Sequence, residues 1–199
     1  SLERIEAFLR RRPRVWRLLN ARADRRAADI NARAQPLVTA ETRPIAVIVG
    51  YGPVGRLVDA LLRDAGVQTV IVDMNIDTVR ALTRSGRLAI YGDATRREVL
   101  EHAGIRRAVH LVVTLPSATG RGALVLTARE LSPEVEIIVR ARHLAERESL
   151  LQAGAGRIIF EEGEAGIALA RHVMERRGLD RQTIDGLLGA VRKVWRMEE

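Results

Sequence analysis

The residues best suited to do chemistry are the glycines of one short loop. Gly50, Gly52 and Gly55 form a G-x-G-x-x-G pattern that follows an apolar run and precedes a segment with helical spacing. In such a loop the first glycine permits a tight turn, the second lets the backbone approach a pyrophosphate, and the third lets helix and strand pack closely. The amino end of the helix offers free N–H groups to the phosphate. The other loop residues, which are also candidate contacts, are Tyr51, Pro53 and Val54.

A carboxylate at the end of the next predicted strand makes this pattern more specific. Asp73 stands 18 residues after Gly55, where an acid can accept hydrogen bonds from both hydroxyls of a ribose. Its negative charge would repel a 2′-phosphate, which disfavours NADP(H) as the ligand. The loop and the carboxylate together predict a ribonucleotide site, which also includes Met74. The alternative is a domain that keeps its glycines for the turn and binds nothing.

A third strand leads into a further candidate segment. Asp93 and Ala94 follow it at the edge of the sheet where doubly wound folds bind ligands, and we expect them to lie over the adenine. Thr95 and Glu98 stand at the spacing of a capping box for the next helix, in which case Asp93 would be a turn residue. The two interpretations are compatible.

Two later strands end in candidate residues as well. Thr114 and Leu115 leave the fourth strand at the crevice where the strand order reverses. Arg140 ends the fifth strand and is expected to reach either a phosphate or a neighbouring acid. We therefore place all three residues in the predicted nucleotide site.

We identify no group for catalysis or metal binding. Cysteine is absent, which excludes a disulfide scaffold, a thiolate metal site and a cysteine nucleophile. The four histidines have no metal-ligand spacing and are interpreted as structural or surface residues. We therefore expect no catalytic residue, no metal site and no enzyme activity. The histidines are His102, His110, His143 and His172.

The elements that must position the site alternate regularly after Pro44. Short apolar runs separated by segments with helical spacing indicate parallel strands that helices cover on both faces. Right-handed crossovers then favour an α/β fold, a Rossmann-like doubly wound sheet of six strands in the order 3-2-1-4-5-6. The predicted strands are 45–49, 67–72, 88–91, 109–114, 135–139 and 158–160.

The composition divides the chain into three parts. Residues 1–43 form a basic arm with eleven arginines and five acidic residues. Its spacing predicts two helical pieces that end before Pro36, followed by a linker to Arg43. Residues 44–178 form the nucleotide-binding domain, and 179–199 hold a last helix whose apolar face needs a partner. The arm is expected to be either an ordinary solvated helix or a contact to an anionic surface such as lipid headgroups.

The order of these segments resembles an RCK domain, also called a KTN or Trk amino-terminal domain. The resemblance covers roughly residues 44–178 and is strongest to the cytoplasmic domain of Kef-type cation:proton antiporters. The segments that carry it are Val47–Gly55, Val72–Asp73, Tyr91–Thr95 and Ile137–Arg142.

The resemblance implies a regulatory domain of a potassium or other monovalent-cation transporter, at the cytoplasmic face of the bacterial inner membrane. It implies a homodimer through the helix after the sixth strand and a membrane transporter domain, in the same or a separate chain, next to the arm. An adenine nucleotide would gate transport, bound through its phosphates, ribose and adenine. The residues carried over for these three parts are Gly50, Gly52 and Gly55, then Asp73, then Asp93 and Ala94.

One departure from the family pattern bears on the ligand. Many members carry a basic residue directly after the second glycine, where this chain has Pro53. Arg56 lies one step further along the helix and is not an obvious replacement. The departure argues against a triphosphate and favours NAD(H) or AMP, while ADP and ATP stay open.

Two other functions are weighed against this one. An NAD-dependent oxidoreductase needs an acid–base group and a substrate domain, yet the chain offers only two tyrosines and Lys193, and little chain beyond the fold. A nucleic-acid-binding protein would use the basic arm, but aromatic residues make up only 3% of the chain. We therefore expect no nucleic-acid partner. The apolar runs are also far shorter than the roughly 18 residues of a membrane-spanning helix.

Overall fold

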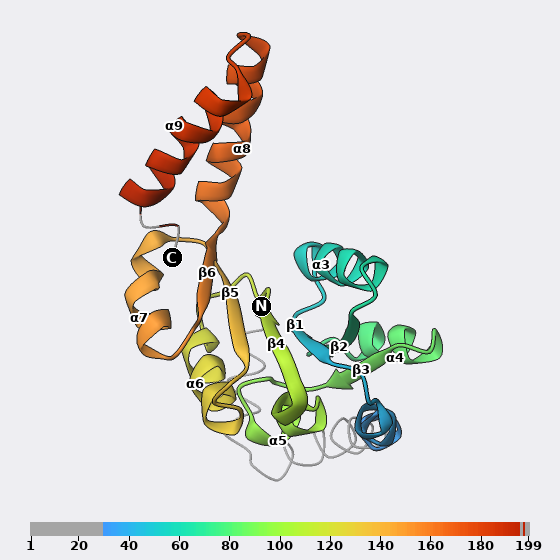
Figure 1. The fold of residues 1–199 in the computed structure, drawn as a ribbon. Helices are drawn as coiled ribbons and strands as arrows, with labels where there is room; N and C mark the ends of the chain where they lie inside the picture. The colour runs from blue at the N-terminus through green and yellow to red at the C-terminus, as the bar shows by residue number, and fades with distance from the viewer. Residues whose placement is uncertain (1–29, 196, 198–199) are drawn as a thin grey trace, which may run out of the picture.

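A parallel six-stranded sheet forms the centre of the fold (Figure 1), in a computed structural model that describes residues 30–195 and 197. The strand order is β3-β2-β1-β4-β5-β6 and every neighbouring pair is parallel. The predicted Rossmann-like topology is therefore confirmed. The strands are β1 (Ile45–Val49), β2 (Gln68–Asp73), β3 (Leu88–Tyr91), β4 (Ala108–Val113), β5 (Glu136–Ala141) and β6 (Arg157–Phe160).

Helices connect the strands and continue beyond the last one. A 3-10 turn precedes β4, and a second precedes the helix between β5 and β6. The helices after β1 are α3 (Pro53–Asp64), α4 (Ile76–Arg84), α5 (Arg97–His102), α6 (Arg121–Leu131), α7 (Arg147–Gln152), α8 (Glu161–Arg176) and α9 (Arg181–Val194), and the turns are η1 (Ile105–Arg107) and η2 (Leu144–Glu146).

Two apolar clusters attach helices to the two faces of the sheet. The larger one joins the strands to α5 and α6, through side chains such as Leu100, Leu111 and Leu124. The smaller one joins Ile48 of β1 to Val79 of α4, with α3 packed at its margin. The larger cluster runs along all six strands, whereas the buried residues of the smaller cluster come only from β1, β2, β3 and α4.

The two halves of the sheet are not covered equally, which corrects the prediction of helices over both faces throughout. Every residue of β1 is buried, whereas buried and more exposed residues alternate along β4, β5 and β6. The physical reason is the course of α8, which follows β6 but runs away from the sheet (Figure 1). Within the described residues, one face of this half is left partly open, and Ile159 is 38% exposed there.

The linker predicted to begin at Pro36 is wrong in its first part, because residues 30–40 are helical. Proline lacks an N–H and normally ends a helix. Here tertiary contacts hold the segment: Ala34 and Val38 are buried in the larger cluster, and the Arg107 guanidinium donates to the carbonyl oxygens of Val38 and Glu41. The remaining predictions for the arm fall on residues 1–29, outside the described residues.

The last two helices form a hairpin that projects from the sheet (Figure 1). Ile167 of α8 packs with Ile184 and Leu188 of α9, so the predicted final helix is present and has found an internal partner. The hairpin does not use all of its apolar surface, however. Leu169 and Val173 on α8 stay 72% and 60% exposed.

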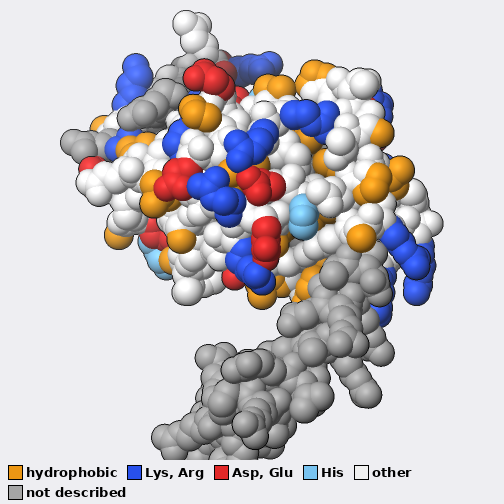
Figure 2. Space-filling model, turned by 90° about the horizontal axis from the view of Figure 1, so that it is seen from below, with side chains coloured by type: hydrophobic (Ala, Val, Ile, Leu, Met, Phe, Trp, Pro, Cys, Tyr) orange, Lys and Arg blue, Asp and Glu red, His pale blue; other side chains and the backbone are white. Residues whose placement is uncertain are grey.

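Charges of both signs are intermixed on the surface. Figure 2 shows Arg or Lys side chains beside Asp or Glu side chains on the face seen from below. Among the exposed ion pairs, Arg97 lies 2.8 Å from Glu130 and Arg106 lies 2.7 Å from Glu101. Exposed pairs of this kind contribute little to stability. They do prevent the charges from adding up to a field of one sign.

A buried carboxylate fixes α3, and with it the glycine loop, against the sheet. Asp59 is 1% exposed and accepts hydrogen bonds from Tyr51 (2.9 Å), Thr69 (2.7 Å) and Arg87 (2.5 Å). Burial disfavours the charged form, but the hydrogen bonds from Arg87, Thr69 and Tyr51 outweigh it and hold the pKa of Asp59 below its ordinary value. The network therefore links the loop, the helix and the beginnings of two strands.

Replacing this carboxylate should destabilise the fold in a pH-dependent manner. Asp59→Asn is expected to lower the free energy of unfolding by about 3 kcal/mol at pH 7, because the Arg87 cation loses its counter-charge. The folded-state pKa lies below the ordinary 3.8, so the carboxylate stabilises the fold above that pH and the contribution is lost as the pH falls through the folded value. Urea unfolding at a series of pH values measures both effects.

Asp64→Asn is the matched control, since Asp64 is exposed at the end of the same helix and should leave stability unchanged. Equal losses in the two variants, or a difference between Asp59→Asn and wild type that does not shrink on acidification, would contradict the assignment.

Candidate nucleotide-binding site

The glycine loop has the geometry that its pattern predicts. Gly50 adopts a φ of +94°, which side chains rarely tolerate, and its N–H donates to the Val72 carbonyl oxygen at 2.8 Å. A Cβ built on Gly55 would lie 2.0 Å from the Gly50 carbonyl oxygen. The first glycine therefore makes the turn, and the third permits the close packing of α3 on the end of β1.

Gly52 is glycine for a different reason. Its φ is −71° and a Cβ built there would meet no atom within 4 Å, so neither backbone strain nor packing requires a glycine. Pro53 occupies the first position of α3, where no N–H is needed. No side chain caps α3 and its first turn has no acidic residue. The space above Gly52 and the N–H groups of Val54 and Gly55 are thus available to a phosphate.

Asp73 lies directly beside this loop. One oxygen of its carboxylate accepts from the N–H of Tyr51 at 2.6 Å, and the other accepts from the N–H of Asn75 at 2.7 Å. Each carboxylate oxygen has a second lone pair, so Asp73 can still accept from ribose hydroxyls. The neighbouring Met74 is exposed. The structure therefore brings together the loop and the carboxylate that the sequence singled out.

The side chains of Tyr51 and Arg56 point in directions that the sequence did not predict. The Tyr51 hydroxyl turns back to Asp59, so only its backbone faces the site. The Arg56 side chain, which we set aside as too far along the helix, returns to the loop and donates from Nε to the Tyr51 carbonyl oxygen at 3.3 Å. A cation therefore reaches the phosphate loop despite Pro53. Its position four residues after Gly52, one helical turn along, was the signal that could have revealed it.

The segment after β3 forms a turn and not a capping box. Asp93 accepts from the N–H and the hydroxyl of Thr95 at 2.9 and 2.8 Å, and α5 begins only at Arg97. The capping box expected for Thr95 is therefore wrong, because its hydroxyl is already bonded to Asp93. Ala94 is buried in the larger cluster, which leaves Asp93 as the side chain of this pair near the surface.

The two candidates that follow β4 contact the glycine loop, and Arg140 on β5 contacts one of them. The Thr114 hydroxyl is buried and lies 2.9 Å from the Gly50 carbonyl oxygen, while Leu115 packs against the same turn. Arg140 pairs with Glu161 through Nε at 3.0 Å and donates to the Thr114 carbonyl oxygen at 3.1 Å. Of the two partners expected for Arg140, the structure gives it the acid.

A groove of about 660 Å³ lies beside Met74 and Asp93. Its walls come from the segment after β3, from α5 and from helix 30–40. The sequence did not predict that the arm contributes to this groove, because Asn31 and Gln35 belong to no motif. The lining residues are Asn31, Ala32, Gln35, Met74, Tyr91, Gly92, Asp93, Arg96, Glu98, Val99 and His102.

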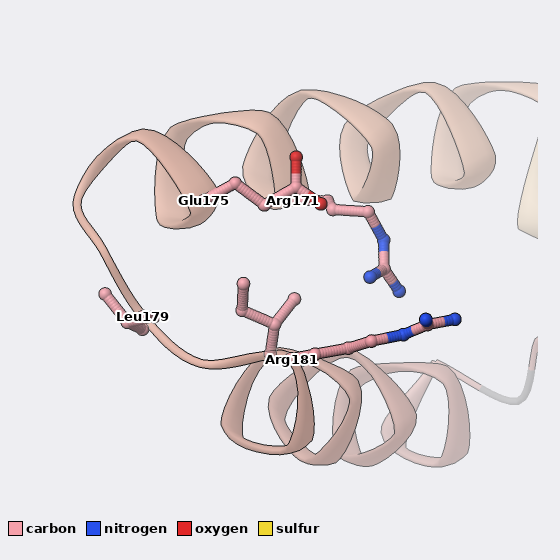
Figure 3. Close-up of a pocket in the computed structure, with 5 residues that line it drawn as sticks. Arg171, Glu175, Leu179 and Arg181 are labelled. Carbon is pink, nitrogen blue, oxygen red and sulfur yellow. The ribbon is translucent and has the colours of Figure 1, made fainter.

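A second hollow, of about 370 Å³, belongs to the α8–α9 hairpin. Figure 3 shows Arg171 and Arg181 extending from the two helices toward the same side of it. Both side chains approach Asp185, at 2.7 and 3.7 Å, so the two cations share one carboxylate within the hairpin. Over residues 30–195 and 197, no group of three or more acidic or histidine side chains is arranged to hold a metal ion.

The fold is a doubly wound sheet of the Rossmann type with a glycine loop at its candidate site, and comparison with known families makes the assignment specific. The family model described as the TrkA-N domain matches residues 46–161, which is more than half of the chain. The chain therefore belongs to the TrkA-N family, and the resemblance to RCK domains is confirmed. None of the described helices is both long and apolar enough to cross a membrane.

Individual relatives agree with this family. The chain is 32% identical over 139 residues to the glutathione-regulated potassium-efflux system protein KefC of Cronobacter sakazakii, an alignment that covers 70% of this chain and 22% of KefC. The chain thus spans about a fifth of the length of the curated relatives it matches. The TrkA-N domain of the inner membrane protein ybaL from Escherichia coli superposes with a TM-score of 0.62 and 29% identity, over 68% of this chain and 98% of that domain.

A third relative has been solved with nucleotides. The GsuK channel bound to NAD superposes with a TM-score of 0.57 and 26% identity, over 67% of this chain and 23% of that one. GsuK has also been solved bound to ADP, with 27% identity and a TM-score of 0.58, over 65% of this chain and 34% of that one.

Substitutions of the third and second glycines of the loop should have different effects. Gly55→Ala is expected to lower the free energy of unfolding by about 3 kcal/mol, because its Cβ would collide with the Gly50 carbonyl group. Gly52→Ala should change stability by less than about 0.5 kcal/mol but weaken nucleotide binding about tenfold, because the new methyl group occupies the approach of the phosphate. Urea unfolding and calorimetric titration with NAD⁺ measure the two effects. Normal nucleotide affinity in Gly52→Ala would show that no phosphate binds at this loop.

Proposed function

We propose that the chain is a regulatory domain of a potassium or other monovalent-cation transporter and binds an adenine nucleotide. The observation that carries the proposal is the pairing of an unobstructed glycine with an adjacent carboxylate. Nothing in the fold requires a glycine at position 52, and Asp73 is held beside it by the N–H of Tyr51. A bound pyrophosphate or phosphate and its ribose account for both features.

The side chains around the loop favour NAD(H) or AMP as the ligand. Asp73 would repel the 2′-phosphate of NADP(H). Pro53 takes the place where many family members have a basic residue. Arg56 reaches the loop from the next turn, so one cation can neutralise part of a diphosphate. ADP and ATP are thereby compatible with the site, although less favoured.

The same geometry supports binding without catalysis. The Tyr51 hydroxyl is bonded to Asp59, and burial together with this hydrogen bond raises the pKa of Tyr51, so the hydroxyl keeps its proton. Tyr51 and Tyr91 both pack against the smaller apolar cluster. The Tyr51 hydroxyl is therefore engaged within the fold and is not free to act as the proton donor that an oxidoreductase requires.

The relatives suggest how a bound nucleotide would act. KefC is named as a potassium-efflux system protein and GsuK as a channel, and each is far longer than this chain. By analogy, the domain lies at the cytoplasmic face of the bacterial inner membrane, with the transporter domain next to the arm. A nucleotide can gate transport only if it binds two arrangements of the protein with different affinity.

A panel of nucleotides tests the binding proposal. Thermal unfolding with NAD⁺, NADH, AMP, ADP, ATP and NADPH at about 100-fold over the dissociation constant should raise the melting temperature by roughly 5–10 °C for the ligands that bind. Asp73→Asn should weaken NAD⁺ about tenfold and reduce the preference over NADP⁺, because the charge beside the ribose is lost. Asp77→Asn, on the exposed first turn of α4, is the control. The absence of a shift with all six ligands would refute the proposal.

The proposal includes a homodimer through α8. The helix leaves the sheet with Leu169 and Val173 exposed, and β6 leaves Ile159 partly exposed on the open half of the sheet. Contacts between two copies would bury these side chains, and their apolar area would stabilise the dimer at roughly 25 cal/mol per Å² before the costs of association.

The mass in solution tests this assembly. Wild-type protein should sediment as a dimer at tens of micromolar, and Leu169→Asp should sediment as a monomer, because it places a charge in the apolar contact. Leu57→Asp on α3 is the matched control, since Leu57 is also an exposed leucine but lies on another helix and should leave the dimer intact. A wild-type monomer, or dissociation by both variants alike, would count against α8 as the interface.

A further inference from the structure

The groove beside the candidate site has one wall that lies outside the segment matched by the TrkA-N model. Gly92, Asp93 and Val99 line it from the α/β domain, and Asn31 and Gln35 line it from helix 30–40. The family model begins only at residue 46. A part of the arm therefore helps to form the cavity next to the predicted adenine contacts.

Asn31 fixes this wall with two reciprocal hydrogen bonds. Its Nδ2 donates to the Tyr91 carbonyl oxygen at 2.7 Å, and its Oδ1 accepts from the Tyr91 N–H at 2.8 Å. Tyr91 ends β3, which is an edge strand, so the amide side chain satisfies backbone groups that no neighbouring strand reaches. Asn31 is only 9% exposed, and hydrogen bonds shielded in this way are costly to break.

The peptide group that Asn31 holds adjoins the predicted adenine contacts. Tyr91 is followed by Gly92, whose N–H donates to the Asp73 carbonyl oxygen at 3.1 Å. A Cβ on Gly92 would lie 2.7 Å from the side chain of Val99, so this turn packs tightly against α5. A movement of Tyr91 would therefore displace both the ribose and the base side of the site.

The groove has the chemistry of a site for a planar heteroaromatic base. Met74 and Val99 offer apolar surface, while Asp93 and Gln35 offer acceptors and donors. His102 also lines the groove, and its Nδ1 is buried with no hydrogen-bond partner in the part of the chain that the structure describes. Small-molecule sites typically have volumes of about 300–1,000 Å³, and this groove of about 660 Å³ lies within that range.

We infer that this groove receives the base of the nucleotide and that helix 30–40 is its outer wall, so that nucleotide binding holds the end of the arm against β3. The inference rests on the proposed nucleotide binding and adds to it a route from the site to the arm. A ligand that touches the docked helix binds the docked state more tightly than the undocked one. By linkage it stabilises docking by the same factor.

Hydrogen exchange of the full chain measures docking directly. With saturating NAD⁺ or AMP, the amides of residues 30–40, apart from Pro36, should exchange about tenfold more slowly than without ligand. Asn31→Ala should speed their exchange and weaken nucleotide binding about five- to tenfold, because both hydrogen bonds to Tyr91 are lost.

Two variants of the same helix separate contact with the ligand from docking. Gln35→Ala should weaken nucleotide binding about threefold or more while leaving ligand-free exchange of the helix unchanged, because Gln35 lines the groove and has no part in the hydrogen bonds to Tyr91. Thr39→Ala, exposed on the same helix and away from the groove, should change neither quantity.

The outcomes distinguish this inference from the proposed function. If nucleotides bind, but exchange of residues 30–40 does not respond and Asn31→Ala and Gln35→Ala bind like wild type, the inference is wrong and the proposed function stands. If NAD⁺, AMP and the other adenine nucleotides neither bind nor slow exchange in the loop at 50–55, the proposed function is wrong and the inference fails with it.

Discussion

The site depends on one close approach, between the first turn of α3 and the end of β1. A Cβ on Gly55 would stand 2.0 Å from the Gly50 carbonyl oxygen, so the helix can reach this position only with a glycine there. The approach turns the amino end of α3 toward the edge of the sheet and brings the Tyr51 N–H to Asp73 at 2.6 Å. The Asp59 network secures the same helix from its other side. Loop, carboxylate and helix end are consequences of a single packing constraint.

The sequence predicted the parts of this arrangement that follow from local rules. The strand order followed from alternation and handedness, and the three glycines and Asp73 followed from their spacing after apolar runs. Local rules failed where distant contacts decide the outcome. Pro36 should end a helix, yet Ala34, Val38 and the Arg107 guanidinium keep residues 30–40 helical. Asn31 belongs to no motif, because its hydrogen-bond partner, Tyr91, lies in a strand 60 residues away in the sequence.

The direction of individual side chains was the second feature that the sequence could not predict. Tyr51 stands in the middle of the glycine loop, but its hydroxyl donates to the buried Asp59 carboxylate, which spacing alone did not indicate. Thr114 and Arg140 were predicted only as contacts of the site, whereas in the structure the Thr114 hydroxyl donates to the Gly50 carbonyl oxygen and Arg140 donates to the Thr114 carbonyl oxygen. Spacing places a residue on a helix, strand or loop. Its hydrogen-bond partner depends on which buried polar groups of the folded chain still need one.

Because helices cover the two halves of the sheet unequally, the residues of the two halves are under different structural constraints. The half formed by β1, β2 and β3 is enclosed by the chain's own helices and carries the loop and Asp73. The half formed by β4, β5 and β6 keeps a partly open face, while α8 departs from it with an apolar surface of its own. Substitutions in the first half would affect folding and the proposed nucleotide site, whereas substitutions on the open face would affect the proposed dimer. A domain divided in this way can exchange its assembly partner over evolution without rebuilding its pocket.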